Sequence, residues 1–241
     1  MSVAEIVDAF QGKLVGLRRE LFVSVAIVNI GIGALTNPEN RPRSVTLRLD
    51  ANTFSEPYPV DELVQHTGNL NTVVFELFQG KMISAWHDLL GDLYGFLIRE
   101  HFDGRRNFPE AKKIRPEISL DASEPLQEQV LRSAVDNFAF LEYSERIKPL
   151  NQALNPTGAA GTQAALIQKH VHIRNAVQHR DSRVNDHMLR RLARHEILLL
   201  DDGGTEREFA LNDPLVLSIP EIESLHRALW LLTNTWRNHG V

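Results

Sequence analysis

Residues 162–179 read TQAALIQKHVHIRNAVQH, and this pattern predicts a helix that is buried along one face. At about 100° per residue, Leu166, Ile173 and Val177 point in one direction. Arg174 falls between this apolar group and a second one further round the helix, so its side chain should point into or along the buried arc. An arginine stays charged there, and an unpaired buried charge is costly. We therefore expect Arg174 to pair with a carboxylate, to bind a phosphate ligand, or to lie in a gap at an interface.

The helix lies within a basic segment of the chain, residues 169–195. Seven basic and two acidic side chains give this segment a formal charge of +5, and it holds five of the ten histidines. Such a run is commonly a solvated helix face, and the alternative is an anion-binding surface. The whole chain carries a net charge of −5, which taken alone argues against a nucleic-acid partner. The net charge of the whole chain is therefore a poor guide to its partner, and the charge of each segment has to be considered separately.

The composition is that of a folded protein. Of the 241 residues, 43% are hydrophobic and 24% are charged, which is too apolar for disorder. The chain has no cysteine, which excludes a disulfide scaffold, a thiolate metal site and a thiol nucleophile. The most apolar stretch, residues 21–35, is shorter than the roughly 20 residues that span a bilayer. Two acids precede it and no clear cleavage site follows. We therefore expect a cytoplasmic protein with no membrane contact.

The fold class predicted from the apolar periodicity is mainly α, with a small β-hairpin near the C-terminus. Glycines or prolines are expected to end or interrupt the helices. The expected helices are residues 3–30, ended by Gly31 and Gly33; residues 60–101, interrupted at Gly80 and Gly91; residues 126–147, stopped by Pro149; residues 162–178, with Thr162 as N-cap; residues 186–194; and a final helix with Pro220 in its first turn. The expected strands are residues 44–49, with Val45, Leu47 and Leu49 facing inward, and a hairpin of residues 196–200 and 208–211.

A proline-containing polar connector, residues 103–125, is the best candidate for a domain boundary. It divides the chain into residues 1–121, a mostly helical region of unknown role, and residues 122–241. The first region either forms a separate unit or extends the same helical bundle. We interpret His87, His101 and His226 in the amphipathic stretches as partly buried or surface histidines rather than metal ligands.

The run Arg174-Asn175-Ala176-Val177-Gln178-His179 resembles the Arg-x4-6-His signature of HEPN domains. The longer run from Ile173 to Val184 is similar to the version of this signature in bacterial members. Helices before the motif, and a hairpin and amphipathic helix after it, agree with the resemblance. The resemblance covers about residues 126–241, and the first 125 residues match no family pattern.

The resemblance implies a HEPN-like helical bundle with a helical N-terminal extension, and for many members a metal-independent endoribonuclease. Carried over, Arg174 stabilises charge on the scissile phosphate, and His179 acts as general base or general acid. Asn175 orients the site. We expect His172, Arg180 and Arg183 to contact RNA. The reaction leaves a cyclic phosphate and needs no cofactor and no metal.

Geometry adds a condition to this interpretation. In a continuous helix Arg174 and His179 diverge by about 140°. Either the helix distorts before His179, or the two side chains complete a site only with a second chain, and we favour a homodimer. The sequence alone does not identify the acidic residue that often supports the motif arginine; the candidates on the preceding helix are Asp136, Glu142 and Glu145.

The function expected from these features is an endoribonuclease of a bacterial defence, toxin or stress system, with RNA as substrate and a possible regulatory protein partner. Two alternatives remain open at this point. One is a catalytically inactive HEPN-like module that binds RNA or a protein. The other is an unrelated helical interaction protein in which the motif occurs by chance.

Overall fold

The computed structural model describes residues 1–38, 44–109, 116–120, 123–155, 158, 161–179 and 182–239. It confirms that the chain is mainly helical and that it carries a small antiparallel hairpin near the C-terminus. The helices are α1 (Val3–Thr36), α2 (Val60–His66), α3 (Leu70–Phe102), α4 (Leu126–Ala139), α5 (Tyr143–Leu154), α6 (Gly161–His179), α7 (Asp186–Leu192) and α8 (Ile219–His239), with a short 3-10 turn, η1 (Thr67–Asn69). The strands are β1 (Ser44–Val45) paired with β2 (Tyr58–Pro59), and β3 (Ile197–Leu200) paired with β4 (Glu206–Phe209).

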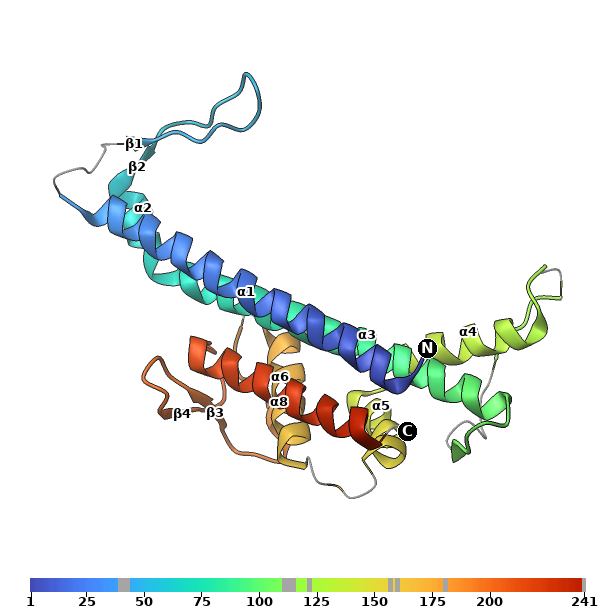
Figure 1. Ribbon diagram of the computed structural model, residues 1–241. Helices are drawn as coiled ribbons and strands as arrows, with labels where there is room; N and C mark the ends of the chain where they lie inside the picture. The colour runs from blue at the N-terminus through green and yellow to red at the C-terminus, as the bar shows by residue number, and fades with distance from the viewer. Residues whose placement is uncertain are drawn as a thin grey trace.

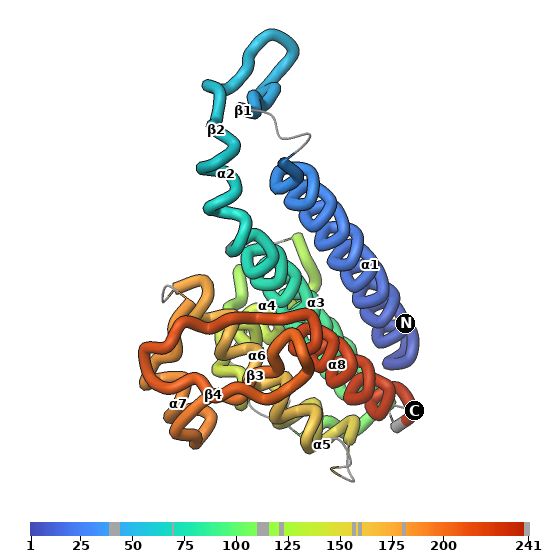
Figure 2. Tube along the Cα trace, turned by 90° about the vertical axis from the view of Figure 1, so that its left-hand side faces the viewer, coloured from blue at the N-terminus to red at the C-terminus, as the bar shows by residue number. Residues whose placement is uncertain are grey.

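Helices α1 and α3 form a long antiparallel pair that projects from the rest of the molecule (Figure 1). Two ion pairs fix the register: Lys13 Nζ lies 3.1 Å from Asp88 Oδ2, and Lys81 Nζ lies 3.6 Å from Glu20 Oε2. Figure 2 shows the same arm from the side, with α2 and the β1–β2 hairpin at its distal end, far from the C-terminus.

The glycines do not break these two helices, contrary to the sequence-based expectation. Helix α1 continues through Gly31 and Gly33, and α3 continues through Gly80 and Gly91. None of the four has a positive φ. A glycine inside a helix costs only about 1 kcal/mol relative to alanine, which a helix of more than 30 residues packed along a partner can absorb.

The core is one cluster of buried side chains that draws on both sides of residue 121. Trp86 of α3 and Trp236 of α8 stack at its centre, with ring centroids 5.2 Å apart. Helix α1 contacts both α3 and α8, and α6 packs between α3 and α8. The division at residue 121 stays a prediction, but the two sides share this core.

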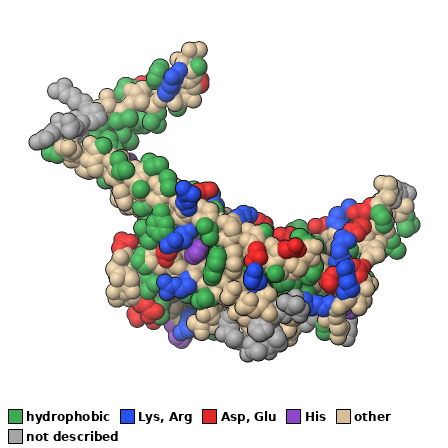
Figure 3. Space-filling model, viewed as in Figure 1, with side chains coloured by type: hydrophobic (Ala, Val, Ile, Leu, Met, Phe, Trp, Pro, Cys, Tyr) green, Lys and Arg blue, Asp and Glu red, His purple; other side chains and the backbone are tan. Residues whose placement is uncertain are grey.

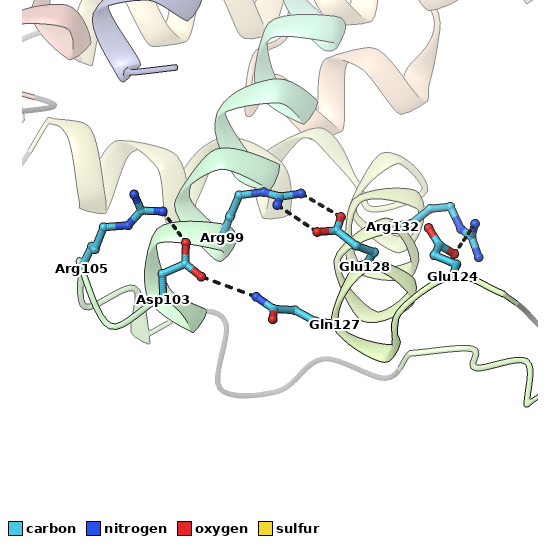
Figure 4. Close-up of polar contacts among 7 residues, drawn as sticks. All are labelled: Arg99, Asp103, Arg105, Glu124, Gln127, Glu128 and Arg132. Carbon is cyan, nitrogen blue, oxygen red and sulfur yellow. Dashed lines mark hydrogen bonds and ion pairs between the residues drawn. The ribbon is translucent and has the colours of Figure 1, made fainter.

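The region around Pro149 was predicted wrongly. Helix α4 ends at Ala139, and α5 begins after Glu142 and contains Pro149. Glu142 and Glu145 form a reciprocal capping box, which starts a new helix where the sequence pattern indicated a continuous one. Figure 4 shows how α4 is held against the end of α3: Arg99 donates to both carboxylate oxygens of Glu128, at 2.9 and 2.8 Å.

One predicted strand and the predicted starts of two helices can be compared with the structure. The strand expected at residues 44–49 is limited to Ser44–Val45, and Leu47 and Leu49 are exposed rather than inward. Helix α6 already includes Gly161, so Thr162 is not its N-cap. Pro220 does lie in the first turn of α8, where its missing N–H leaves no intrahelical bond unmade.

Glu221 of α8 is a buried carboxylate that joins three elements. Its Oε1 lies 2.6 Å from Lys169 Nζ and 2.9 Å from His170 Nε2, both on α6. Its Oε2 accepts a hydrogen bond of 2.8 Å from the backbone N–H of Leu200 on β3. Burial raises the pKa of Glu221, but these partners outweigh it and lower that pKa to about 2. The carboxylate is therefore ionised at neutral pH and fixes how α6 faces α8.

The distal half of the arm exposes apolar side chains that nothing in the described chain covers (Figure 3). Ile27 and Ile30 of α1 are 65% and 73% exposed. Helix α1 is long and apolar enough to cross a membrane, judged by length and composition alone, and only 11% of its most apolar window is buried. The 15-residue stretch counted in the sequence is part of this longer helix, so length does not exclude a membrane span.

We predict that Glu221→Ala lowers the free energy of unfolding by about 3–5 kcal/mol, because it leaves Lys169 and His170 without their buried partner. Urea denaturation monitored by circular dichroism measures this change. Glu223→Ala is the matched control, since Glu223 is on the same helix as Glu221 but pairs with Arg18 of α1 near the protein surface. Such surface pairs contribute at most about 1 kcal/mol. Equal losses in the two variants would contradict the role given to Glu221.

Candidate functional site

Helix α6 is continuous to His179, so it directs Arg174 and His179 into different cavities. Arg174 lines a groove of about 620 Å³ between α1, α3 and α6. His179 lines a cavity of about 470 Å³ together with His172, Asn175 and His187. The structure of one chain therefore does not bring the two motif residues together. This is the divergence that helical geometry predicts in the absence of a distortion.

Arg174 has no carboxylate partner among the described residues. Its Nη1 is 3.4 Å from Oδ1 of Asn175, and its Nε is buried without a hydrogen-bond acceptor. Glu76 lines the same groove, but its Oε1 accepts a hydrogen bond of 2.9 Å from Ser182. The groove therefore presents a guanidinium that forms no ion pair with a described carboxylate, although the carboxylate of Glu76 also lines the groove.

The three acidic residues considered as partners of Arg174 bind other groups or lie in a different cavity. Glu142 pairs with Arg191 at 2.7 Å, and Glu145 accepts the backbone N–H of Glu142 at 3.2 Å. Asp136 lines a separate cavity at the α3–α4 contact. None of the three candidates contacts Arg174 within the described chain.

The His179 cavity adjoins a second one of about 350 Å³, and both are lined by His172, Asn175 and His187. The second cavity adds His87 of α3 and Arg146 of α5. We call the combined surface the histidine cleft, defined by His87, Arg146, His172, Asn175, His179 and His187.

Two imidazole rings face each other inside the histidine cleft. His172 and His187 meet edge to face, with centroids 6.2 Å apart. Burial lowers the pKa of His172, and the neighbouring His187 and Arg191 lower it further. His172 is therefore a neutral imidazole at pH 7, able to accept a proton.

His87 is held in one tautomer by Arg146. Nη1 of Arg146 lies 3.1 Å from His87 Nδ1, and Nη2 donates to the His87 backbone carbonyl at 3.1 Å. A guanidinium only donates, so Nδ1 accepts and the ring proton lies on Nε2. Burial and the charges of Arg146 and Arg174 lower the pKa of His87 to about 4.

The residues expected to contact RNA are dispersed. His172 lies in the histidine cleft. Arg183 is exposed, and its Nη1 donates to the carbonyl of Asn212 at 2.7 Å, outside the cleft. Arg180 lies outside the described residues.

The sequence did not indicate His87, Arg146 or His187 as site residues. His87 was interpreted as an ordinary partly buried histidine, and nothing distinguished Arg146 from other arginines on amphipathic helices. His87 and Arg146 are 59 positions apart, so only the packing of α5 against α3 brings them together. His187 stands within the basic segment, and its charge context was the one available signal.

Comparison of the chain with protein-family models, with curated proteins and with solved structures gives no match. The resemblance to HEPN domains therefore rests on the motif residues and their helical context. The described residues contain no group of three or more histidine, aspartate or glutamate side chains placed to hold a metal ion.

We predict that the imidazole of His87 titrates with a midpoint near pH 4 in the folded protein. Because the pKa is lowered on folding, the unfolded chain binds more protons between about pH 6.5 and 4. His87 therefore contributes stability above pH 6.5 that is lost as the pH falls through 4. An NMR titration of the imidazole signals measures the midpoint, and a value near 6.5 would contradict the buried, Arg146-bound geometry.

Proposed function

We propose that the protein is a metal-independent endoribonuclease of HEPN type. The observation that carries the proposal is the placement of the Arg174–His179 motif on α6, with both side chains lining cavities. His179 stands among other imidazoles, and Arg174 has an unpaired charge within the described chain. Imidazole and guanidinium are the groups that metal-free cleavage of RNA requires.

In the proposed reaction the ribose 2′-oxygen attacks the adjacent phosphorus while an imidazole takes the 2′-hydroxyl proton. The bond from phosphorus to the 5′-oxygen breaks, and that oxygen receives a proton from a second imidazole. The products are a 2′,3′-cyclic phosphate and a free 5′-hydroxyl. His179 is one of the two proton-transfer groups, and the candidates for the other are His172 and His187, which line the same cavity.

The proposal includes a homodimer, because one chain separates its two motif residues. Arg174 of one copy would stabilise the phosphate held at His179 of the other. Asn175 can form hydrogen bonds near both motif residues, since it contacts Arg174 and lines the histidine cleft beside His179.

The biological setting belongs to the proposal as well. We place the enzyme in the cytoplasm, in a bacterial defence, toxin or stress system in which a protein partner regulates it. The exposed apolar part of α1 is the feature that a membrane-bound alternative would use.

The second candidate function is an inactive HEPN-like module that binds RNA or a protein. The separation of Arg174 from His179 within one chain favours it, because a monomer would hold no complete motif site.

We predict that the purified protein cleaves single-stranded RNA in the presence of EDTA. Arg174→Ala and His179→Ala each lower the rate by about a hundredfold or more, since each removes a group that acts in the transition state. Arg132→Ala and His66→Ala are the controls, because both residues are exposed and lie away from α6. Denaturing gel electrophoresis of labelled RNA measures the rates.

Equal cleavage by all five proteins would identify a contaminating nuclease and contradict the assignment. Retained RNA binding without cleavage by the wild-type protein would favour the inactive module.

A further inference from the structure

Arg146 is a buried cation whose charge no described carboxylate neutralises. Its side chain is 8% exposed, and its Nε is buried without an acceptor. Among the described residues, its two Nη atoms form hydrogen bonds only with His87, through the ring Nδ1 and the backbone carbonyl. The guanidinium also stacks over Phe138, with its Cζ 5.2 Å from the ring centroid. Both neighbours leave the positive charge in place.

The acidic and phenolic groups near Arg146 are engaged elsewhere. Glu142 lines the same cavity, but its Oε1 binds Arg191 at 2.7 Å. Asp88, next to His87 in sequence, pairs with Lys13 on the arm. The hydroxyl of Tyr143 accepts a hydrogen bond of 3.2 Å from the Trp86 indole, and burial raises its pKa, so it stays neutral.

Burying a guanidinium without a counterion destabilises the folded protein. A folded protein recovers that stability when an anion occupies the site, and the cavity of about 350 Å³ beside Arg146 is large enough for one phosphate group. Besides Glu142, Tyr143 and three apolar side chains, the cavity is lined by groups that can donate hydrogen bonds. His87 carries its ring proton on Nε2, and the other such groups in the lining are His172, Asn175 and His187.

We propose that Arg146 and His87 form a phosphate-binding site in the histidine cleft, separate from the groove that holds Arg174. The site takes a phosphate group, either of a free nucleotide or of an RNA chain. For RNA the inference rests on the proposed function: the site then holds a phosphate next to the scissile one at His179. It deepens that function by naming a substrate-binding group that the Arg-x4-6-His motif does not include.

The first test is calorimetric titration of the folded protein with inorganic phosphate. Wild type binds phosphate, and Arg146→Met, which keeps the length and apolar packing of the side chain, weakens binding about tenfold or more. Arg146→Lys keeps the charge but not the planar fork, so its affinity falls between the two. Arg132→Met is the matched control, because it removes an exposed arginine of α4 that pairs with Glu124, which precedes this helix (Figure 4). This variant binds phosphate as wild type does.

Two further titrations separate the sources of the phosphate. A mononucleotide and a 2′-O-methylated RNA, which cannot be cleaved, are each added alone and in competition with inorganic phosphate. Tighter binding of the RNA, lost in Arg146→Met, identifies a backbone phosphate. Equal or tighter binding of the mononucleotide identifies a free nucleotide.

The inference and the proposed function fail in different ways. Wild type that does not cleave RNA but binds phosphate through Arg146 refutes the nuclease and supports the phosphate site. Wild type that cleaves RNA while a folded Arg146→Met binds phosphate unchanged refutes the phosphate site. If the variants do not fold, the imidazole NMR signals of His87 in wild type decide: a shift that saturates with phosphate supports the site, and no shift overturns it.

Discussion

An ionised carboxylate in the core must be paired, and Glu221 therefore fixes the rotation of α6. Lys169 and His170 have to face α8 to reach it, at 2.6 and 2.9 Å. On a regular helix His172, Asn175 and His179 then point between about 140° and 200° away from His170. This is the side on which α5 and α7 close the histidine cleft. Arg174 lies only about 40° from His170 and meets α3 instead.

Arg146 and Arg174 combine burial with the lack of a described carboxylate partner. Several exposed arginines have carboxylate partners, as Arg18 has Glu223 and Arg237 has Asp8. Arg146 and Arg174 are more buried, yet no described carboxylate pairs with either. Two guanidiniums without a described carboxylate partner, beside several imidazoles, favour an anion at this part of the molecule although the whole chain has a net charge of −5.

Local patterns predicted much of the fold and the local part of the site. Periodicities of 2 and 3.6 residues are visible in short stretches of sequence. They predict the helical class, the C-terminal hairpin and the divergence of Arg174 from His179. The helix breaks at Gly31 and Gly91 were wrong because packing along a partner helix outweighs the propensity of one residue. His87 and Arg146 could not be predicted, because their contact depends on how α3 and α5 meet.

The account depends on Arg174 and His179 acting together from two copies of the chain. The most direct test is a heterodimer purified with two different tags, in which one copy carries Arg174→Ala and the other His179→Ala. One of its two sites then carries both substitutions and the other carries neither, so we predict RNA cleavage at about half the wild-type rate although each homodimeric variant is inactive. A heterodimer that forms but does not cleave RNA, or a wild-type protein that is active as a monomer, would contradict the account.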